Sequence, residues 1–390
     1  MQLIRTPILL ILFLIASSPV FACDFGNIQF SKDFDGGKLD SCKQLGDNRF
    51  MVTSTPEDEP INPSPWYAFK VSAKTVPSTI EVMIHSPKSN QRYVPKISTD
   101  GEHWQTIDFE MDGADLHLTL NITDQEVYVS GQELLTMDDY QEWMQSVLTS
   151  QRFTKVNIGK SFQQRPIDGL IVQQDTNNEW LIVIGRQHPP EVTGAIAMQA
   201  FIDKLAQTKP LTQRFFERFN LLVVPLVNPD GVTNGNWRHN NNGKDLNRDW
   251  GKFTQPETTA IGQYINGLLT NGQRVVFALD FHSTQQDIFY TMPTDYGLVP
   301  KDFSEQWLAA LKNQRLGSFT VRERPGSSPG RGVFKQYIAD TYGVHAVTYE
   351  LGDNTERKLI PHIAKLSAQL LMQQMLATPK AAFIPQKEKL

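Results

Sequence analysis

The sequence predicts an α/β protein, a mixed, mostly parallel sheet flanked by helices, preceded by a small antiparallel β-sandwich domain. Before about residue 130, short runs of alternating apolar and polar residues are separated by Gly, Pro, Asn and Asp, a pattern typical of antiparallel strands. From about residue 167, apolar runs alternate with amphipathic segments, which indicates strands covered by helices on both faces. We therefore expect a sandwich at 23–132, a connecting helix or linker at 133–155, an α/β domain at 156–378 and a flexible tail at 379–390.

The first 22 residues have the features of a secretory signal peptide. Arg5 precedes an apolar run at 8–15, and the small-residue end Val20-Phe21-Ala22 predicts cleavage after Ala22. The apolar run is shorter than the ~20 residues that span a bilayer. No later segment is long and apolar enough to do so. We therefore expect an exported protein, periplasmic or secreted, with no transmembrane segment in the mature chain.

Cys23 and Cys42 are the only two cysteines. In an oxidising compartment an even count favours a disulfide, and closing so short a loop would contribute about 3 kcal/mol. The alternative is a lipid-attachment box at 20–23 with an acylated Cys23. Phe21 fits that pattern poorly, and Cys42 would be left unpaired, so we rank the disulfide first.

Individual elements follow from the spacing of apolar residues. Three runs of the sandwich alternate clearly, at 66–71, 80–84 and 116–120. The connecting helix is expected at 138–151, where five large side chains recur at helical spacing: Tyr140, Trp143, Met144, Val147 and Leu148. In the α/β domain the expected strands are 180–185, 221–227, 275–280 and 346–351, and the expected helices are 191–207, 256–269, 303–313 and 359–377.

The overall charge argues against one class of partner. With 37 Lys and Arg against 42 Asp and Glu, the chain has no global positive field, so we expect no nucleic acid partner. A hydrophobic content of 40% over 390 residues suffices for the cores of two domains. The oligomeric state is left open.

Candidate metal ligands follow two of the expected strands. His188 and Glu191 lie just beyond the first strand of the α/β domain, and His282 ends another. Two imidazoles and a carboxylate leave a fourth position open for water, as in catalytic zinc sites. Glu350 ends a third strand, and open α/β sheets bind ligands beyond the carboxyl ends of their strands. We expect these four residues to meet at one sheet edge; the alternative places them in unrelated surface loops.

A polar segment at 228–250 follows the expected strand 221–227. Its density of Asn, Asp and Gly predicts a long irregular loop, and such loops are often functional. Arg238 and Arg248 within it are candidates for binding anions. The alternative is that both are solvated arginines of a polar loop.

Six segments together resemble the zinc carboxypeptidases in order and spacing. They are Gly185-Arg186-Gln187-His188-Pro189-Pro190-Glu191, Asn228-Pro229-Asp230-Gly231-Val232, Gly235-Asn236-Trp237-Arg238, Asp245-Leu246-Asn247-Arg248, Asp280-Phe281-His282 and Thr348-Tyr349-Glu350. Within that family the chain resembles the cytosolic carboxypeptidase (deglutamylase) branch and its bacterial relatives. Members of this branch carry a β-sandwich before the catalytic domain, and segments 34–41 and 66–69 resemble theirs. The resemblance implies a zinc metallocarboxypeptidase with one Zn²⁺ per chain and a peptide or peptide-like substrate.

The resemblance also implies a role for each site residue. His188, Glu191 and His282 would hold the zinc. Glu350 would be the general base for a zinc-activated water, and Arg238 would stabilise the oxyanion at the scissile carbonyl. The pair Asn247-Arg248 would bind the terminal carboxylate of the substrate, which restricts cleavage to the last residue.

The expected substrate preference depends on two further basic residues. In the family, the residue 15 positions before the catalytic Glu lines the pocket for the last side chain, and that residue is Lys335. Arg331 resembles a Gly-Arg element of the deglutamylase branch. Two cations there favour an acidic C-terminal side chain. The alternative is that Lys335 is simply an exposed residue on a helix at 333–340.

The chain departs from the family at three points. Pro190 replaces the usual Gly before the ligand Glu. The tyrosine that closes over substrate in digestive members has only Tyr290 and Tyr342 as candidates here. Export would also keep the protein away from the tubulin-like tails that the cytosolic branch trims.

Three alternative functions remain beside the favoured one. The first is a carboxypeptidase or amidase acting on cell-wall peptides, and the second is a zinc deacylase of acylated amino acids. The third is a peptide-binding protein that has kept the fold and lost turnover.

Overall fold

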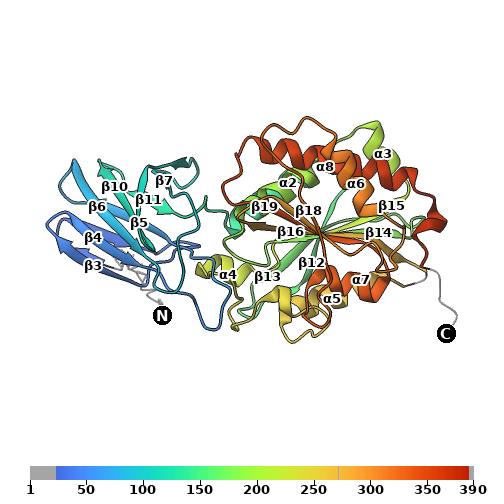
Figure 1. Ribbon diagram of the computed structural model, residues 1–390, viewed down its shortest axis with the longest axis horizontal. Coiled ribbons are helices and arrows are strands. Elements are labelled where there is room, and N and C mark those ends of the chain that lie inside the picture. The colour runs from blue at the N-terminus through green and yellow to red at the C-terminus, as the bar shows by residue number, and fades with distance from the viewer. Residues whose placement is uncertain (1–22, 271, 386–390) are drawn as a thin grey trace, which may run out of the picture.

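The computed structural model describes residues 23–270 and 272–385, in three sheets and the helices around them (Figure 1). The predicted signal peptide at 1–22 and the last five residues of the predicted tail lie outside the described residues. Within the described part, no helix combines the length and apolar character needed to cross a bilayer.

The N-terminal domain is a sandwich of two sheets, as predicted. One sheet has the order β1 (Cys23–Phe25), β2 (Ile28–Ser31), β5 (Ala68–Ala73), β11 (Val127–Ser130), β7 (Lys96–Ser98) and β8 (Gln105–Thr106). The other has the order β3 (Ser41–Gly46), β4 (Arg49–Thr53), β6 (Ser78–His85), β10 (Asp115–Ile122) and β9 (Phe109–Asp112). In the two sheets of this domain, all described strand pairs are antiparallel except β4 with β6. Alternating side chains from both sheets fill one core, which includes Phe30, Phe50, Phe69 and Val82.

Cys23 on β1 and Cys42 on β3 form a disulfide between the two sheets. Their Cα atoms lie 6.1 Å apart, and the bridge closes a loop of sequence separation 19. It therefore fastens the first strand of the described chain to the opposite sheet.

The second domain is built on an eight-stranded mixed sheet. Its order is β12 (Thr154–Lys160), β13 (Pro166–Val172), β15 (Phe219–Val224), β14 (Glu179–Gly185), β16 (Arg274–Thr284), β19 (Ala346–Gly352), β17 (Ile288–Thr291) and β18 (Glu323–Pro325). The four central strands β15, β14, β16 and β19 are parallel neighbours. They correspond to the four strands predicted from the sequence, because strands buried on both faces appear as continuous apolar runs.

Helices cover both faces of this sheet. In Figure 1, α2 (Val192–Ala206), α3 (Pro210–Phe216), α6 (Phe303–Lys312) and α8 (Leu359–Ala377) lie above it, and α5 (Pro256–Leu268) and α7 (Phe334–Tyr342) lie below. Two separate apolar cores fill the layers between sheet and helices. The connecting helix α1 (Met137–Leu148) packs against the first of these cores through Tyr140, Met144 and Val147.

Two segments differ from the sequence prediction. The polar segment 228–250 contains a short helix, α4 (Pro229–Asn234), and a 3₁₀ turn, η1 (Leu246–Arg248). α4 forms because Asn228 caps its N-terminus by accepting from Gly231 N, with Pro229 in its first turn. The tail, expected to fray from Pro379, begins with the 3₁₀ turn η2 (Lys380–Phe383). Phe383 is fully buried there against other aromatic rings, and this burial orders the segment.

Candidate metal centre

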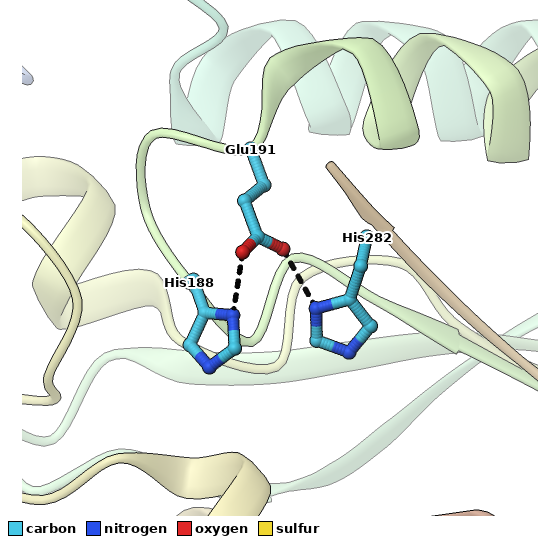
Figure 2. A group of neighbouring side chains, drawn as sticks. All are labelled: His188, Glu191 and His282. Atoms are coloured by element: carbon cyan, nitrogen blue, oxygen red, sulfur yellow. Dashed lines mark hydrogen bonds and ion pairs between the residues drawn. The ribbon is translucent and has the colours of Figure 1, made fainter. Parts of the chain in front are cut away.

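His188, Glu191 and His282 converge at the carboxyl ends of β14 and β16 (Figure 2). Glu191 is the N-cap residue of α2, and its two carboxylate oxygens face the two imidazoles. Oε1 lies 2.7 Å from Nδ1 of His188, and Oε2 lies 2.6 Å from Nδ1 of His282. All three side chains are buried, and their donor atoms lie within 4.8 Å of one another.

The far nitrogen of each imidazole is held by a carboxylate. Nε2 of His188 lies 2.9 Å from Asp245 Oδ1, and Nε2 of His282 lies 2.8 Å from Asp280 Oδ2. Such contacts fix the ring orientation and leave each Nδ1 free to bind a metal. Burial opposes ionisation of Glu191, but His188 and His282 hold the pKa of its carboxyl well below the usual range. Two imidazoles and one ionised carboxylate, all buried and oriented, fit a zinc ion.

The backbone around these ligands is tightly packed. Arg186 adopts a positive φ of 54°, and its Nε donates to Pro189 O at 2.7 Å, which curls the loop back from β14 toward α2. A Cβ on Gly194 would lie 2.3 Å from the carbonyl oxygen of His282, so α2 can approach β16 this closely only with glycine there. Ser283 joins the two elements, because its backbone N–H donates to Glu191 Oε2 and its Oγ accepts from Gly194 N.

Glu350 lies beside the metal ligands. It is the register partner of His282 in the parallel pair β16–β19, and paired residues of neighbouring strands project from the same face. Its Oε2 atom is buried and has no hydrogen-bond partner among the described residues. Burial, reinforced by the negative charge of Glu191, raises the pKa of Glu350 to about 7. A carboxylate with such a pKa can accept a proton near neutral pH.

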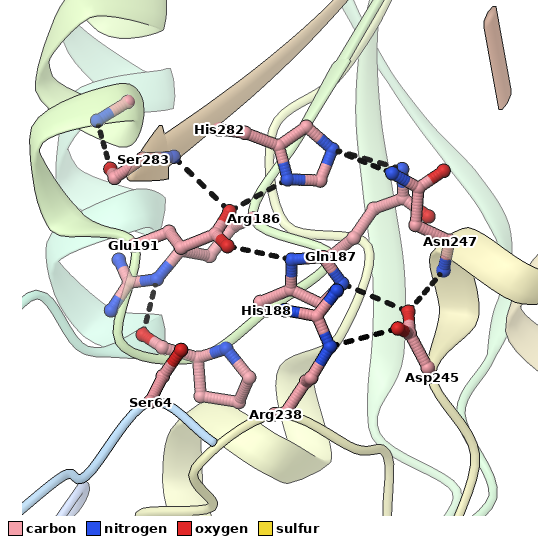
Figure 3. Close-up of polar contacts among 12 residues, drawn as sticks. Ser64, Arg186, Gln187, His188, Glu191, Arg238, Asp245, Asn247, His282 and Ser283 are labelled. Carbon is pink, nitrogen blue, oxygen red and sulfur yellow. Dashed lines mark hydrogen bonds and ion pairs between the residues drawn. The ribbon is translucent and has the colours of Figure 1, made fainter. Parts of the chain in front are cut away.

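The two arginines of segment 228–250 differ in burial, and neither is fully exposed. Arg238 is buried, and its Nε donates to Asp245 Oδ2 at 2.8 Å (Figure 3). Asp245 therefore connects Arg238 to His188. Arg248 is half-buried and donates through Nη1 to Asn247 O at 2.7 Å. Burial lowers the pKa of Arg248; the charge of Asp245 opposes this shift, and the charges of Arg238 and Arg331 add to it.

Asn247 links this segment to both the metal centre and α7. Its Nδ2 lies 3.3 Å from Nε2 of His282, and its Oδ1 accepts from Phe334 N at 3.0 Å. The Arg331 loop packs here as well: Gly332 has a φ of 72°, and a Cβ there would meet Arg248 O at 2.3 Å. The structure thus brings the predicted carboxylate clamp next to the first residues of α7.

Lys335 is buried, so the alternative that it is an exposed helix residue is wrong. Its Nζ donates to the carbonyl oxygens of Thr291 and Gly326 and forms no ion pair with any described carboxylate. Burial lowers the pKa of Lys335 to about 8. An ammonium has three donors, so one remains for another acceptor. Arg331, by contrast, is exposed.

The two candidate tyrosines occupy different places. Tyr290 is on β17, one strand from Glu350, and is half-buried. Tyr342 lies at the end of α7, where its hydroxyl is bonded to Asn266 Oδ1 at 3.0 Å and lies 3.3 Å from the hydroxyl of Tyr337. Pro190 is buried, and its carbonyl accepts from Val192 N, so the loop enters α2 without the usual glycine.

Sequence reasoning missed several supporting residues. Asp280 could have been found, because residues i and i+2 of a strand share a face, and it precedes His282 by two. Glu57 and Arg92 could not have been found. They belong to the sandwich and contact residues 180 or more positions later in the chain.

Comparisons with known protein families agree with this geometry. Residues 140–375, more than half of the chain, match the model for "Zinc carboxypeptidase". Residues 30–131 match the model for "Cytosolic carboxypeptidase N-terminal domain".

Relatives with similar sequences include an uncharacterised protein of Zymomonas mobilis, 24% identical over 75% of this chain and 77% of its own length. Mouse cytosolic carboxypeptidase 6 is 29% identical over 34% of this chain, and human cytosolic carboxypeptidase 4 is 30% identical over 39%. These alignments span only 26% and 13% of the two mammalian proteins.

Solved structures that share the fold include two metallo-carboxypeptidases. A metallo-carboxypeptidase from Burkholderia cenocepacia has a TM-score of 0.74 at 16% identity, covering 90% of this chain and 99% of its own. A metallo-carboxypeptidase from Pseudomonas aeruginosa, in complex with (2-guanidinoethylmercapto)succinic acid, has a TM-score of 0.74 at 24% identity, covering 90% and 98%. The similarity extends over both domains.

Proposed function

The chain belongs to the zinc carboxypeptidase family, and from that premise we propose that it hydrolyses the last peptide bond of peptides and favours acidic C-terminal residues. One observation carries the proposal: Glu350 and His282 are register partners on neighbouring parallel strands, beside two further buried ligands. A base placed next to an open metal position is the arrangement that hydrolysis of an amide requires.

The chain's own residues divide the chemistry between them. His188, Glu191 and His282 would hold the zinc, which when bound would supply Lewis-acid activation of water and of the scissile carbonyl. Glu350 accepts the proton from the water through its carboxylate and returns it to the nitrogen of the leaving amino acid. Its raised pKa suits both transfers, because a group that titrates near neutrality can take up and release a proton.

Arg238 is proposed to stabilise the oxyanion. Asp245 occupies its Nε, and no hydrogen bond within the described chain occupies its two terminal NH₂ groups. Those donors are therefore available for negative charge that develops on the carbonyl oxygen. Asp245 also contacts Nε2 of His188, so the same carboxylate positions the proposed oxyanion donor, Arg238, and a metal ligand.

Arg248 and Asn247 are proposed to bind the terminal carboxylate. Arg248 has Nε and Nη2 free of described partners, and a guanidinium can bind both oxygens of a carboxylate. The side chain of the substrate's last residue would then lie near Lys335. Lys335 is in the first turn of α7, and this turn is bonded to Asn247 through the backbone N–H of Phe334. The ammonium of Lys335, which has no ion-pair partner among the described residues, favours an acidic side chain on the substrate's last residue. The exposed Arg331 adds a second positive charge.

We also propose that the protein is exported. The disulfide between Cys23 and Cys42 supports an oxidising compartment, whereas the matched mammalian proteins are named cytosolic. The substrate would then be an extracellular or periplasmic peptide.

The test is release of single amino acids from a panel of peptides that end in Glu, Asp, Lys, Phe or diaminopimelate. Each peptide is assayed as purified, after chelation and after zinc is restored. We expect release of Glu and Asp that stops with the chelator and returns with zinc. Peptides with an amidated C-terminus are the control, because they lack the carboxylate that Arg248 binds.

Other outcomes would redirect the assignment. Release of Lys or Phe would keep the carboxypeptidase and discard the acidic preference, and release of diaminopimelate alone would indicate a cell-wall substrate. If no peptide is cleaved but acylated amino acids are, the enzyme is a deacylase. Tight peptide binding without any turnover would make it a binding protein.

A further inference from the structure

A carboxylate of the sandwich domain holds the backbone of the Arg238 segment. Glu57 Oε2 accepts from Trp237 N at 2.7 Å, and its Oε1 accepts from Arg238 N at 2.9 Å and from His239 N at 2.5 Å. Three successive backbone N–H groups that point at one anion form a concave anion-binding turn. Here the anion comes from a different domain, 180 residues earlier in the chain.

The side chains on either side reinforce this contact. The indole of Trp237 is fully buried and donates to Ser54 Oγ at 3.0 Å. Nδ1 of His239 lies 2.5 Å from Asp58 Oδ1. Residues 54–58 therefore contact each residue from Trp237 to His239, whereas the guanidinium of Arg238 is bonded to Asp245.

From Arg238 the chain of contacts continues to the metal centre. Its Nε donates to Asp245 Oδ2, and Asp245 Oδ1 faces Nε2 of His188 (Figure 3). Glu57 fixes the backbone of Arg238, and Asp245 fixes its guanidinium. With both ends fixed, the terminal NH₂ groups can point in only a narrow range of directions.

We infer that Glu57 is a positioning residue of the active site: the sandwich domain uses it to set the direction in which Arg238 presents its donors to the oxyanion. This inference rests on the proposed function. It also gives the N-terminal domain a role in catalysis, since without Glu57 three N–H groups lose their acceptor and the segment must rearrange. A shift of about 1 Å in such a donor can cost 10²-fold in rate.

The first experiment compares E57Q with E59Q in the full chain. Gln keeps the shape of Glu but lacks the charge, and its NH₂ group would face N–H donors. Glu59 is the matched control, because it is two residues away, exposed, and among the described residues pairs only with Lys88 on the surface. We expect E57Q to lower kcat by roughly 10- to 100-fold, with KM changed less than about threefold and zinc content unchanged. E59Q should behave like the wild type.

The second experiment separates positioning from general damage by a double-mutant cycle with R238A. If Glu57 acts through Arg238, E57Q should change kcat less than about twofold in the R238A background. An equal loss of kcat with and without Arg238 would overturn the inference, as would a wild-type kcat in E57Q. If E57Q does not fold, E57D, which keeps the charge on a shorter stem, replaces it in the same cycle.

A third measurement does not depend on activity. Amide hydrogen exchange of a peptide covering 236–240 should be faster in E57Q than in E59Q or the wild type, because its N–H groups lose their acceptor. Unchanged exchange would overturn the inference even if the enzyme is active. If the wild type cleaves no substrate, the proposed function fails, and the exchange result still decides whether Glu57 holds this segment.

Discussion

Arg92 of the sandwich and Asp353 of the α/β domain form a bidentate ion pair. Arg92 Nε lies 2.5 Å from Asp353 Oδ2, and Nη2 lies 3.1 Å from Oδ1. The same guanidinium donates to Ser64 Oγ at 2.8 Å and to Ser283 O at 3.0 Å. Ser283 follows the ligand His282, and Asp353 comes three residues after Glu350. The sandwich therefore contacts β16, which carries His282, and the residue that follows β19, which carries Glu350.

Replacing Arg92 should destabilise the protein. In R92A the buried carboxylate of Asp353 loses its partner, and such a change typically costs about 3–5 kcal/mol. R92K keeps the charge but not the bidentate geometry, so its free energy of unfolding should fall by less than that of R92A. Urea unfolding of the three proteins measures this. A loss below about 1 kcal/mol in R92A would show that the pair contributes little to the domain contact.

Replacing Glu350 should stop turnover without releasing the metal. E350Q keeps the size of the side chain but cannot accept the water's proton, so kcat should fall by about 10²- to 10⁴-fold. Zinc content, measured by elemental analysis, should stay at one per chain, whereas H188A should lose zinc. An E350Q enzyme with near-normal kcat would assign the base to another residue.

The preference for acidic residues should depend on pH through Lys335. Its pKa of about 8 means that the side chain is mostly cationic at pH 7 and mostly neutral at pH 9. The ratio of kcat/KM for a peptide ending in Glu to that for one ending in Phe should therefore fall as pH rises through 8. Taking the ratio cancels the titration of groups that serve both substrates. In K335M the ratio should be low and independent of pH; a pH-dependent ratio in K335M would assign the selector elsewhere.

Reducing the disulfide should lower stability without affecting the metal centre. The bridge closes a loop of sequence separation 19, and in the chain-entropy model a loop of this size contributes about 3 kcal/mol. The melting temperature should fall with reductant in the wild type but not in C42S. Mass spectrometry of Cys23 supplies the complementary check, since an acyl chain on its sulfur is incompatible with the bridge.

The sequence predicted those parts of the fold that local patterns determine. The central strands were found because each is a continuous apolar run, as in 181–184 of β14. The ligands His188 and His282 were placed at one edge because parallel strands end together. α4 was missed because its six residues depend on the cap from Asn228 rather than on an apolar face.

Contacts between the domains could not be predicted. Nothing in the residues around Glu57 distinguishes it from Asp58 or Glu59, and only the folded chain shows which carboxylate meets the N–H groups of Trp237 to His239. The burial of Lys335 was equally inaccessible, since it depends on carbonyls from two distant loops.

The ion pair between Arg92 and Asp353 also bears on the order in which the protein assembles. The two residues are 261 positions apart, so the contact must await synthesis of most of the chain. A domain that folds early during synthesis would present Arg92 long before its carboxylate exists. Assembly of the site is then a late step, and a chain interrupted before Asp353 lacks the carboxylate that joins the two domains.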